Sequence, residues 1–267
     1  MKRLRRITFA CLLLSAVLFA ASTLLQRQRS DSTLPVIEIT QEPLILSVSE
    51  HGSDALLAGM TARDEKDGDL TGHILLRDIL LQEGSRMKAT YFVADSDHHI
   101  AVASRTVEYT DYLPPRFSLS APLTYAPGGT VRIKDRLTAS DVIDGDLSDR
   151  IRINANNLSP RYDGVYPVTF EVTNSLGDTS SLTLDITVKT PEAGAPVIRL
   201  RDYLIYVSEN DAFDPMQYLE SVSGASKNDV AVKLPVRGLQ KGINTVTYSC
   251  VSSGGVRGEA VLYVVAE

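Results

Sequence analysis

The stretch that decides the fold is VTFEVTNSLG, residues 168–177, in which apolar or aromatic residues alternate with polar ones before a polar turn. Two other stretches share this pattern: ATYFVADSDH at 89–98, earlier in the chain, and VTYSCVSSGG at 246–255, later in the chain. A second alternating run follows each of them, at 101–109, 181–189 and 259–265. Alternation with period two places one face of a strand inward, so each pair of runs predicts a β-hairpin.

A second landmark also recurs. DEKDGDLT at 64–71 matches DVIDGDLS at 141–148. Proline-led strand starts recur at 35–37, 115–117 and 196–198. Landmarks that return in one order at nearly equal spacings indicate an internal repeat. We therefore expect three modules, with module 1 at 35–112, module 2 at 113–190 and module 3 at 196–267. A linker at 26–34 precedes module 1, and a second linker at 191–195 joins modules 2 and 3.

The pattern within each module predicts an antiparallel β-sandwich of two sheets. Its strands are short, turn signals come about every 8–12 residues, and no sustained helical period follows Leu25. We expect each module to bury its own core and the modules to follow one another in an extended series. The expected core anchors are Tyr91, Val93, Phe170, Val172, Tyr248 and Cys250.

The N-terminus has the pattern of a membrane segment. Residues 1–6 are basic, and the run 7–25 carries no charge and is close in length to the roughly 20 residues that cross a bilayer as a helix. An uncleaved anchor and a signal peptide cleaved near Ala20-Ala21-Ser22 are both compatible with this run. The basic residues before it indicate a cytoplasmic N-terminus. We expect a single-pass membrane protein with a cytoplasmic tail at 1–6 and extracellular modules, or a secreted protein if the segment is cleaved.

The charge distribution argues against nucleic acid as a partner. Residues 1–30 carry six of the 27 basic residues and no acidic one, so the rest of the chain has a net charge of −12. Such an acidic body repels phosphate backbones.

The two landmarks together resemble a known family. The pattern D-x-x-D-G-D-L-[ST], followed by G-x-Y-x-V-T-[FY]-x-V-x-[DN]-S-x-G, is similar to bacterial surface Ig-like repeats of the pesticidal-crystal-protein type, which are related to hyalin-type repeats. Module 2 matches best, whereas module 1 lacks the glycine and aromatic residue before its hairpin and module 3 has SVSGASKND at 221–229 in place of the acidic loop. The resemblance implies three tandem Ig-like sandwich modules, so together with the apolar run at 7–25 we expect an all-β chain behind a single N-terminal transmembrane helix. It also implies a stalk or adhesion role at a bacterial surface, without catalysis.

The acidic loops are the candidate metal sites. Each gathers three carboxylates around a glycine, and Ca²⁺ takes six to eight oxygen ligands. The register of an EF-hand fails, because Leu75 or Arg152 stands at the twelfth position, where a glutamate is needed. The alternative is a structural turn in which Asp side chains accept backbone N–H bonds. The candidate calcium ligands are Asp64, Asp67, Asp69, Asp141, Asp144 and Asp146.

No catalytic pattern stands out, so we do not expect an enzyme. The sequence has no Gly-x-Ser-x-Gly elbow, His-Glu-x-x-His helix, Walker loop or Cys-x-x-Cys pair. Cys250 aligns with Val93 and Val172, which predicts a small core residue, and Cys11 lies in the apolar run. The adjacent His98 and His99 fall in a predicted hairpin turn, where neighbouring side chains point apart.

These observations lead to an expected function. We expect a non-catalytic, membrane-anchored extracellular Ig-like repeat protein of a bacterial envelope that acts as a structural stalk, adhesion or protein-interaction module. The expected partners are the membrane, through residues 7–25, and a protein or other envelope component, with no cofactor beyond possible Ca²⁺. The divergent module 3 is the expected place of a specific contact. The alternative is an envelope glycan-binding module, for which the candidate exposed rings are Tyr109, Tyr112, Tyr125, Tyr162 and Tyr203.

Overall fold

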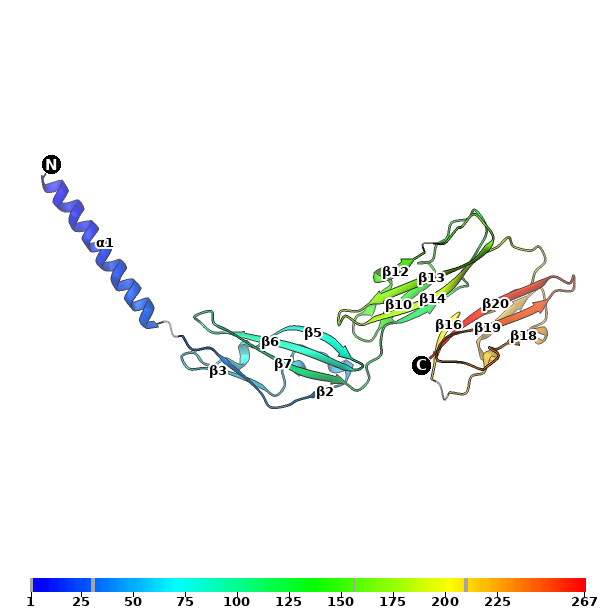
Figure 1. Cartoon of the computed structure of the whole chain (residues 1–267), viewed down its shortest axis with the longest axis horizontal. Helices are drawn as coiled ribbons and strands as arrows, with labels where there is room; N and C mark the ends of the chain where they lie inside the picture. The colour runs from blue at the N-terminus through cyan, green and yellow to red at the C-terminus, as the bar shows by residue number, and fades with distance from the viewer. Residues whose placement is uncertain (1, 30–31, 156, 209–210) are drawn as a thin grey trace. The chain divides into compact units, whose positions relative to one another are not determined.

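The computed structural model describes residues 2–29, 32–155, 157–208 and 211–267. The chain divides into two compact units, which we call unit 1 (Met1–Asp111) and unit 2 (Tyr112–Glu267) (Figure 1). Apart from one long N-terminal helix, both units are built from strands and short helical turns. The prediction of an all-β body is confirmed.

The long helix, α1 (Lys2–Arg29), corrects the expected location of the protein. Within the part of the chain that the structure describes, no helix combines the length and the apolar character that crossing a bilayer requires. The predicted single-pass membrane protein, anchored through residues 7–25 with a cytoplasmic N-terminus, is therefore wrong. Helix α1 extends over the basic residues at both ends of the apolar run, and the run itself includes the hydroxyl-bearing Ser15 and Thr23.

Module 1 contains two sheets. Its strands are β1 (Val36–Ile39), β2 (Leu44–Leu46), β3 (Met60–Asp64), β4 (Gly68–Asp69), β5 (Leu75–Glu83), β6 (Arg86–Ala94) and β7 (Ile100–Tyr109). One sheet has the order β1-β3-β4 and the other β2-β7-β6-β5, in which β2 runs parallel to β7. The short helices are η1 (Val48–Glu50), α2 (Ser53–Leu56) and η2 (Thr71–His73).

Modules 2 and 3 repeat this order. Module 2 contains β8 (Arg116–Leu119), β9 (Thr124–Tyr125), β10 (Leu137–Asp141), β11 (Gly145–Asp146), η3 (Ser148–Arg150), β12 (Arg152–Asn154), β13 (Gly164–Thr173) and β14 (Thr179–Val188). Module 3 contains β15 (Val197–Leu200), β16 (Leu204–Val207), η4 (Pro215–Tyr218), β17 (Leu219–Ser223), η5 (Lys227–Asp229), β18 (Ala231–Lys233), β19 (Gly242–Val251) and β20 (Arg257–Ala266). Their sheets are β8-β10-β11 with β9-β14-β13-β12, and β15-β17 with β16-β20-β19-β18.

The small sheet of module 3 has two strands where the other modules have three. The absent strand corresponds to β4 and β11, which belong to the acidic loops that module 3 lacks in its sequence. Apart from this strand, the strand order is the same in the three segments, while the module boundaries drawn from the sequence and the three copies of the repeat remain a prediction.

The three expected hairpins are confirmed as β6–β7, β13–β14 and β19–β20. Their alternating residues point into the cores because successive side chains of a strand face opposite sides. All six predicted core anchors are buried: Tyr91, Val93, Phe170, Val172, Tyr248 and Cys250. The period of the apolar residues was thus sufficient to orient these strands.

The cores of modules 2 and 3 join within unit 2, which differs from the expected series of separate cores. One buried apolar cluster includes Phe117 and Leu119 of β8 and continues through Tyr203 to Tyr263 of β20. The backbone N–H of Tyr203 donates to the carbonyl oxygen of Leu119 at 3.1 Å, and the Tyr263 hydroxyl donates to that of Asp185 at 3.1 Å. Modules 2 and 3 therefore lie side by side.

Candidate functional site

The acidic loop of module 1 is a tight turn built by its own carboxylates. Asp64 ends β3, and its Oδ1 accepts hydrogen bonds from the backbone N–H groups of Lys66 and Asp67, both at 2.9 Å. Gly68 follows at φ 75°, a conformation that a residue with a Cβ rarely adopts. In the next turn, Asp69 Oδ1 accepts from the backbone N–H of Thr71 at 2.9 Å.

The loop of module 2 is built in the same way. Asp141 Oδ1 accepts from the backbone N–H groups of Ile143 at 3.1 Å and Asp144 at 2.7 Å, and Gly145 has φ 72°. Asp146 Oδ1 accepts from the backbone N–H of Ser148 at 2.9 Å. These bonds match the structural-turn interpretation of the two loops.

A second set of bonds fastens each acidic loop to a hairpin turn. Asp67 accepts from the backbone N–H and the Oγ of Ser96, both at 2.8 Å. Asp144 accepts from the same two groups of Ser175, both at 2.6 Å. Burial raises the pKa of Asp144, but the hydrogen bonds from Ser175 and the charge of Arg150 lower it more, so the carboxyl titrates below its usual range. Sequence reasoning missed Ser96 and Ser175, although the shared [DN]-S dipeptide was the available signal.

The two modules differ at one position beside the loop. In module 2, Asn174 Nδ2 donates to Asp141 Oδ2 at 2.8 Å, so an amide fills the space next to that carboxylate. Module 1 has Asp95 at the equivalent position of its hairpin, one residue before Ser96. A carboxylate cannot donate such a bond when it is ionised. Module 1 therefore brings negative oxygens together where module 2 pairs a donor with an acceptor.

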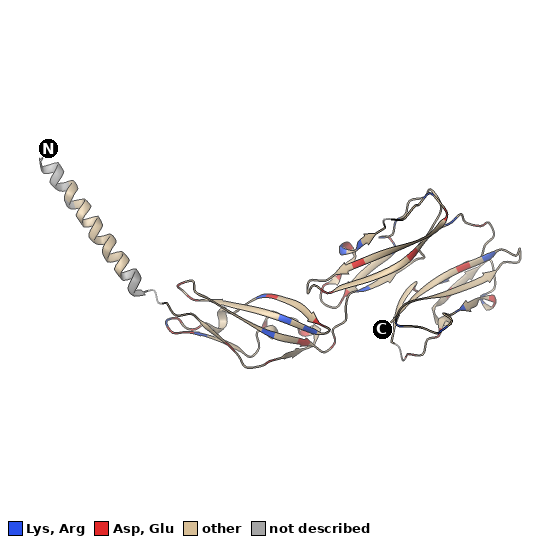
Figure 2. Ribbon diagram, in the orientation of Figure 1, with Lys and Arg blue, Asp and Glu red and all other residues tan. Residues whose placement is uncertain are grey.

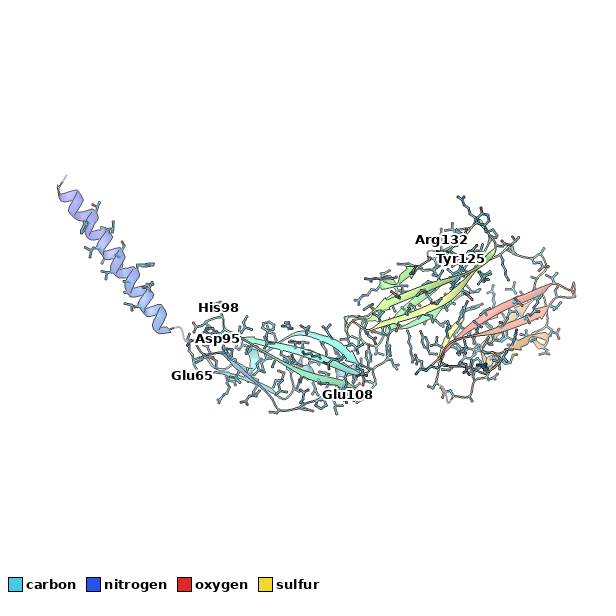
Figure 3. All side chains as sticks on the ribbon, in the orientation of Figure 1. Glu65, Asp95, His98, Glu108, Tyr125 and Arg132 are labelled. Atoms are coloured by element: carbon cyan, nitrogen blue, oxygen red, sulfur yellow. The ribbon has the colours of Figure 1, made fainter. Side chains whose placement is uncertain are left out.

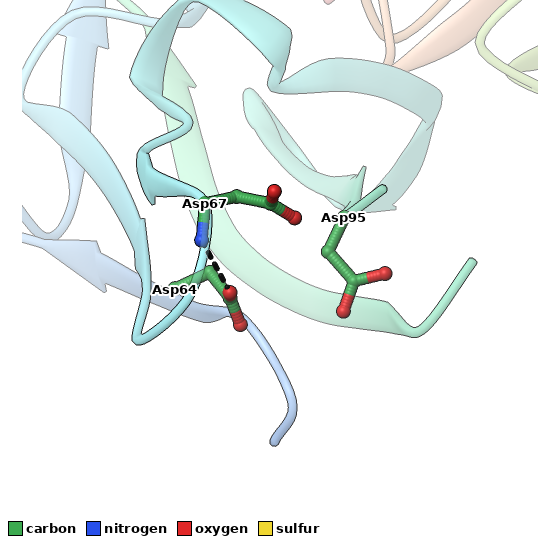
Figure 4. A group of neighbouring side chains, drawn as sticks. All are labelled: Asp64, Asp67 and Asp95. Carbon is green, nitrogen blue, oxygen red and sulfur yellow. Dashed lines mark hydrogen bonds between the residues drawn. The ribbon is translucent and has the colours of Figure 1, made fainter. Parts of the chain in front are cut away.

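Asp64, Asp67 and Asp95 form a cluster that could hold a metal ion (Figure 4). One oxygen of each lies within 4.8 Å of the others, and Asp64 and Asp95 are buried. Thr33 Oγ1 donates to Asp64 Oδ2 at 3.5 Å. Oxygen ligands of this kind suit a hard cation such as Ca²⁺. Of the predicted ligands, Asp64 and Asp67 are brought together, Asp69 lies outside the cluster, and Asp95 was not predicted.

His99 also forms hydrogen bonds with Asp95. Its backbone N–H donates to Asp95 Oδ1 at 2.8 Å, and its Nδ1 lies 2.7 Å from Asp95 Oδ2. Burial raises the pKa of Asp95, and the hydrogen bonds from His99 outweigh it, so the pKa is lowered overall. His98 takes φ 71° in the same hairpin turn, and Figure 3 places it with Asp95 and Glu65 at one end of module 1.

The carboxylate cluster of module 1 gives a prediction for Ca²⁺ binding, and the equivalent amide of module 2 supplies the control. We expect Ca²⁺ to raise the melting temperature of unit 1 relative to excess chelator, because a ligand that binds only the folded state stabilises it. Asp95→Asn should abolish the increase, since it recreates the amide of module 2. Asn174→Asp should in turn make unit 2 respond to Ca²⁺. Differential scanning calorimetry with Ca²⁺ and with chelator measures both, and identical melting curves for all three proteins would contradict calcium binding.

Asp111, at the end of unit 1, is engaged in structural bonds. Its Oδ1 accepts from the backbone N–H of Val48 at 2.7 Å, and its Oδ2 accepts from Ser47 Oγ at 2.8 Å. These hydrogen bonds lower the pKa of Asp111 below its usual value. The carboxylate thus holds the start of η1 against the end of β7.

The lowered pKa of Asp111 gives a pH dependence with a definite sign. The folded state binds this proton less readily than the unfolded state, so its stabilisation is complete above the unfolded pKa of about 3.9 and is lost as the pH falls through the folded pKa. We expect unit 1 to lose stability on acidification below about pH 4, and Asp111→Asn to flatten this loss. Melting temperatures of both proteins along a pH series test this, and parallel curves would refute it.

Most of the tyrosines predicted to be exposed rings are buried or hydrogen-bonded. Tyr109, Tyr125 and Tyr203 are buried, and Tyr112 donates to Asp178 Oδ2 at 2.7 Å and accepts from Asn174 Nδ2 at 3.0 Å. Tyr162 is the exception, with 71% of its surface exposed. It lies in the loop of module 2 that joins β12 to β13.

The two cysteines have separate environments. Cys250 is buried in the core of module 3, and burial raises the pKa of its thiol, as expected for a small core residue. Cys11 is exposed on α1.

Among the described residues, the charged side chains of the two units are of mixed sign. Lys and Arg on the one hand and Asp and Glu on the other occur along the strands and loops of both units (Figure 2).

Comparisons with known proteins give partial matches. No family model matches the chain. The chain is 33% identical over 124 residues to pesticidal crystal protein Cry22Aa of Bacillus thuringiensis, a match covering 46% of this chain and 15% of that protein. It is 31% identical over 121 residues to an uncharacterized 81.3 kDa protein of Acholeplasma phage L2, covering 45% of this chain and 15% of the phage protein. The match to the crystal protein agrees with the resemblance in the sequence, while membership of that repeat family and the three copies remain a prediction.

Solved structures show only weak similarity. The CBM51-2 domain in complex with GlcNAc and INT domains from Clostridium perfringens ZmpB are 17% identical with a TM-score of 0.24, covering 57% of this chain and 41% of that chain. Drosophila N-cadherin EC1-4 is 13% identical with a TM-score of 0.24, covering 89% of this chain and 67% of that chain. Similarity at this level says nothing further about the present chain.

Proposed function

We propose that the chain is a non-catalytic Ig-like β-sandwich repeat protein of the bacterial surface type, and that it acts as a protein-interaction module. The observation that carries the proposal is the placement of exposed apolar or aromatic residues in the same loop of modules 2 and 3. In each module this loop joins the terminal strand of the large sheet to the first strand of the long hairpin. The sandwiches position these loops, and the loops contact the partner protein.

The loop is longer in modules 2 and 3 than in module 1, and in both of these modules it carries exposed side chains. In module 1 it consists of Gly84 and Ser85 alone, between β5 and β6, whereas the loop between β12 and β13 of module 2 runs from 155 to 163. The loop between β18 and β19 of module 3 runs from 234 to 241. Val236, at the tip of this last loop, is 98% exposed. The backbone N–H of Gly238 donates to the carbonyl oxygen of Pro235 at 3.0 Å, so a turn holds the valine outward.

An apolar side chain that is fully exposed on an ordered turn gains nothing from the core of its own module. Contiguous exposed apolar patches commonly mark contact sites, and Leu234, which is 45% exposed, lies in the same loop as Val236. The divergence of module 3 from the acidic-loop pattern supports the same location. The partner is expected to present an apolar pocket to Val236.

The test is a capture experiment with a matched control. The full chain serves as bait in envelope extracts, with Val236→Ser and Val142→Ser compared in parallel. Val142 is a second exposed valine, at 50%, but it lies in the acidic loop of module 2. We expect Val236→Ser to reduce capture of a specific protein about tenfold and Val142→Ser to leave it unchanged. Equal capture by both variants would refute the proposal. Truncation before residue 196 is unsuitable, because it would expose the joined core of unit 2.

Glycan binding is the second candidate, and the exposure of Tyr162 favours it. A ring that is 71% exposed offers a flat apolar face of the kind on which sugars stack. NMR titration with envelope polysaccharide fragments should shift the signals of residues 157–163, and Tyr162→Ala should abolish these shifts. Shifts that persist in Tyr162→Ala, or no shifts in the unmodified chain, would exclude glycan binding at this loop.

A further inference from the structure

Strand β5 is the exposed edge of the large sheet in module 1. It is the terminal strand in the order β2-β7-β6-β5 and, among the described residues, pairs only with β6. It has nine residues, whereas the equivalent strands β12 and β18 have three each. A long edge presents a row of backbone N–H and C=O groups that another strand can pair with. Module 1 therefore has a longer pairing edge than the other two modules.

The sequence of this edge, LLRDIL at 75–80, is nearly symmetric about the point between Arg77 and Asp78. Apolar residues flank a central pair of opposite charges, Arg77 and Asp78. In an antiparallel pairing of two copies about the point between these residues, Arg77 of each copy lies opposite Asp78 of the other. Leu75 then lies opposite Leu80, and Leu76 opposite Ile79. Opposite charges and apolar residues placed directly across a strand pair are favourable.

A β-bulge places these residues on matching faces. Leu76 pairs with Tyr91 and Asp78 with Thr90, so Arg77 is an extra residue with no partner on β6. Leu75 and Leu80 are five positions apart and would face opposite sides of a regular strand. Because of the bulge, both lie on the outward face, where they are 56% and 51% exposed. The bulge thus places residues at equal distances from the point between Arg77 and Asp78 on the same face of β5.

The charges remain accessible. Arg77 Nε and Asp78 Oδ2 lie 2.7 Å apart, and their side chains are 56% and 35% exposed. In a two-fold pair of β5 strands, the two arginines and two aspartates form a network of four alternating charges. Such an isologous contact uses the same residues of both copies and closes after two chains.

We propose that two copies of this chain associate through antiparallel pairing of their β5 strands, which joins the large sheets of the two copies of module 1 into one. This proposal is independent of the partner contact proposed for module 3. The occupant of the edge is a second copy of the chain because the edge complements itself in charge and in apolar residues. Pairing also covers Leu75 and Leu80.

The test is a charge-reversal cycle on the full chain, followed by sedimentation equilibrium between about 1 and 100 µM. We expect a monomer–dimer equilibrium. Arg77→Asp and Asp78→Arg should each weaken it about tenfold, because each places like charges across the pair. The double variant R77D/D78R should restore the dissociation constant to within about threefold. Arg152→Asp, the same charge change on the terminal strand β12, should have no effect.

Several outcomes would overturn the proposal. A chain that remains monomeric throughout the range has no such contact. Association that the single reversals leave unchanged uses another surface, such as the exposed apolar residues of α1. If a single reversal prevents folding, as judged by circular dichroism, Leu80→Lys takes its place and should also weaken the dimer about tenfold. A dimer that is unaffected by this variant would equally refute pairing through β5.

Discussion

Replacement of Arg105 by alanine is expected to lower the free energy of unfolding of unit 1 by about 2–4 kcal/mol. Arg105 is 2% exposed in the hairpin strand β7. Its Nη1 donates to the carbonyl oxygen of Ala58 at 2.6 Å, its Nη2 donates to that of Leu56, and its Nε donates to the Tyr91 hydroxyl at 3.2 Å. The guanidinium also lies 5.4 Å from the centre of the Tyr91 ring. The variant removes these donors and leaves a cavity beside α2.

The other modules supply the control for Arg105. Leu184 and Leu262 occupy the equivalent places in β14 and β20, and both are buried. Arg105→Leu should therefore lose less stability than Arg105→Ala, because leucine fills the space but donates nothing to the carbonyl oxygens. Hydrogen exchange of the β6 and β7 amides reports the opening of unit 1 alone. Equal exchange in Arg105→Ala and the unmodified chain would contradict the prediction.

Substitution of Gly258 by alanine is expected to destabilise unit 2 by about 3 kcal/mol. A Cβ at this position of β20 would lie 2.1 Å from the carbonyl oxygen of Pro196 and 2.9 Å from its carbonyl carbon. Both atoms belong to the backbone, so no side-chain rotation relieves the clash. The strand pair β15–β17 or β20 itself must move.

Gly254→Ala is the matched control for Gly258. Its Cβ would meet Ser252 Oγ at 3.7 Å, which is an ordinary contact. We expect a change within about 0.5 kcal/mol. Hydrogen exchange of the β19 and β20 amides distinguishes the two variants. Similar exchange rates in both would show that the chain accommodates the added methyl group at Gly258.

The sequence predicted the hairpins and their inward faces because strand orientation follows from a local period of two. Tyr91 and Phe170 are buried for this reason. The period does not reveal which loop a turn contacts, so the bonds from Ser96 to Asp67 and from Ser175 to Asp144 escaped prediction. These pairs lie 29 and 31 residues apart.

Two of the three residues of the carboxylate cluster were predicted. Asp64 and Asp67 were recognised because they stand together in the acidic loop, whereas Asp95 arrives from the hairpin. The repeat itself carried the missing signal, since Asp95 replaces the asparagine of module 2. The length and lack of charge of residues 7–25 predicted a membrane anchor, which was wrong.

The joined core of modules 2 and 3 also escaped prediction. Tyr263 stands between the inward-facing Leu262 and Val264 of β20, so its side chain lies on the opposite face of the strand, where module 2 covers it. A repeat seen in sequence predicts similar units. It does not predict whether neighbouring units share an interior.

The side-by-side packing in unit 2 has a mechanical consequence. Arg116 Nη2, at the start of β8, forms an ion pair with Glu267, so the first strand of unit 2 and its last residue lie together. Arg116 and Glu267 are therefore close in space although most of unit 2 lies between them in the sequence. If unit 2 is pulled from these two residues, we expect the ion pair and the hydrogen bonds of Tyr203 and Tyr263 to break first, so that modules 2 and 3 separate before either module unfolds.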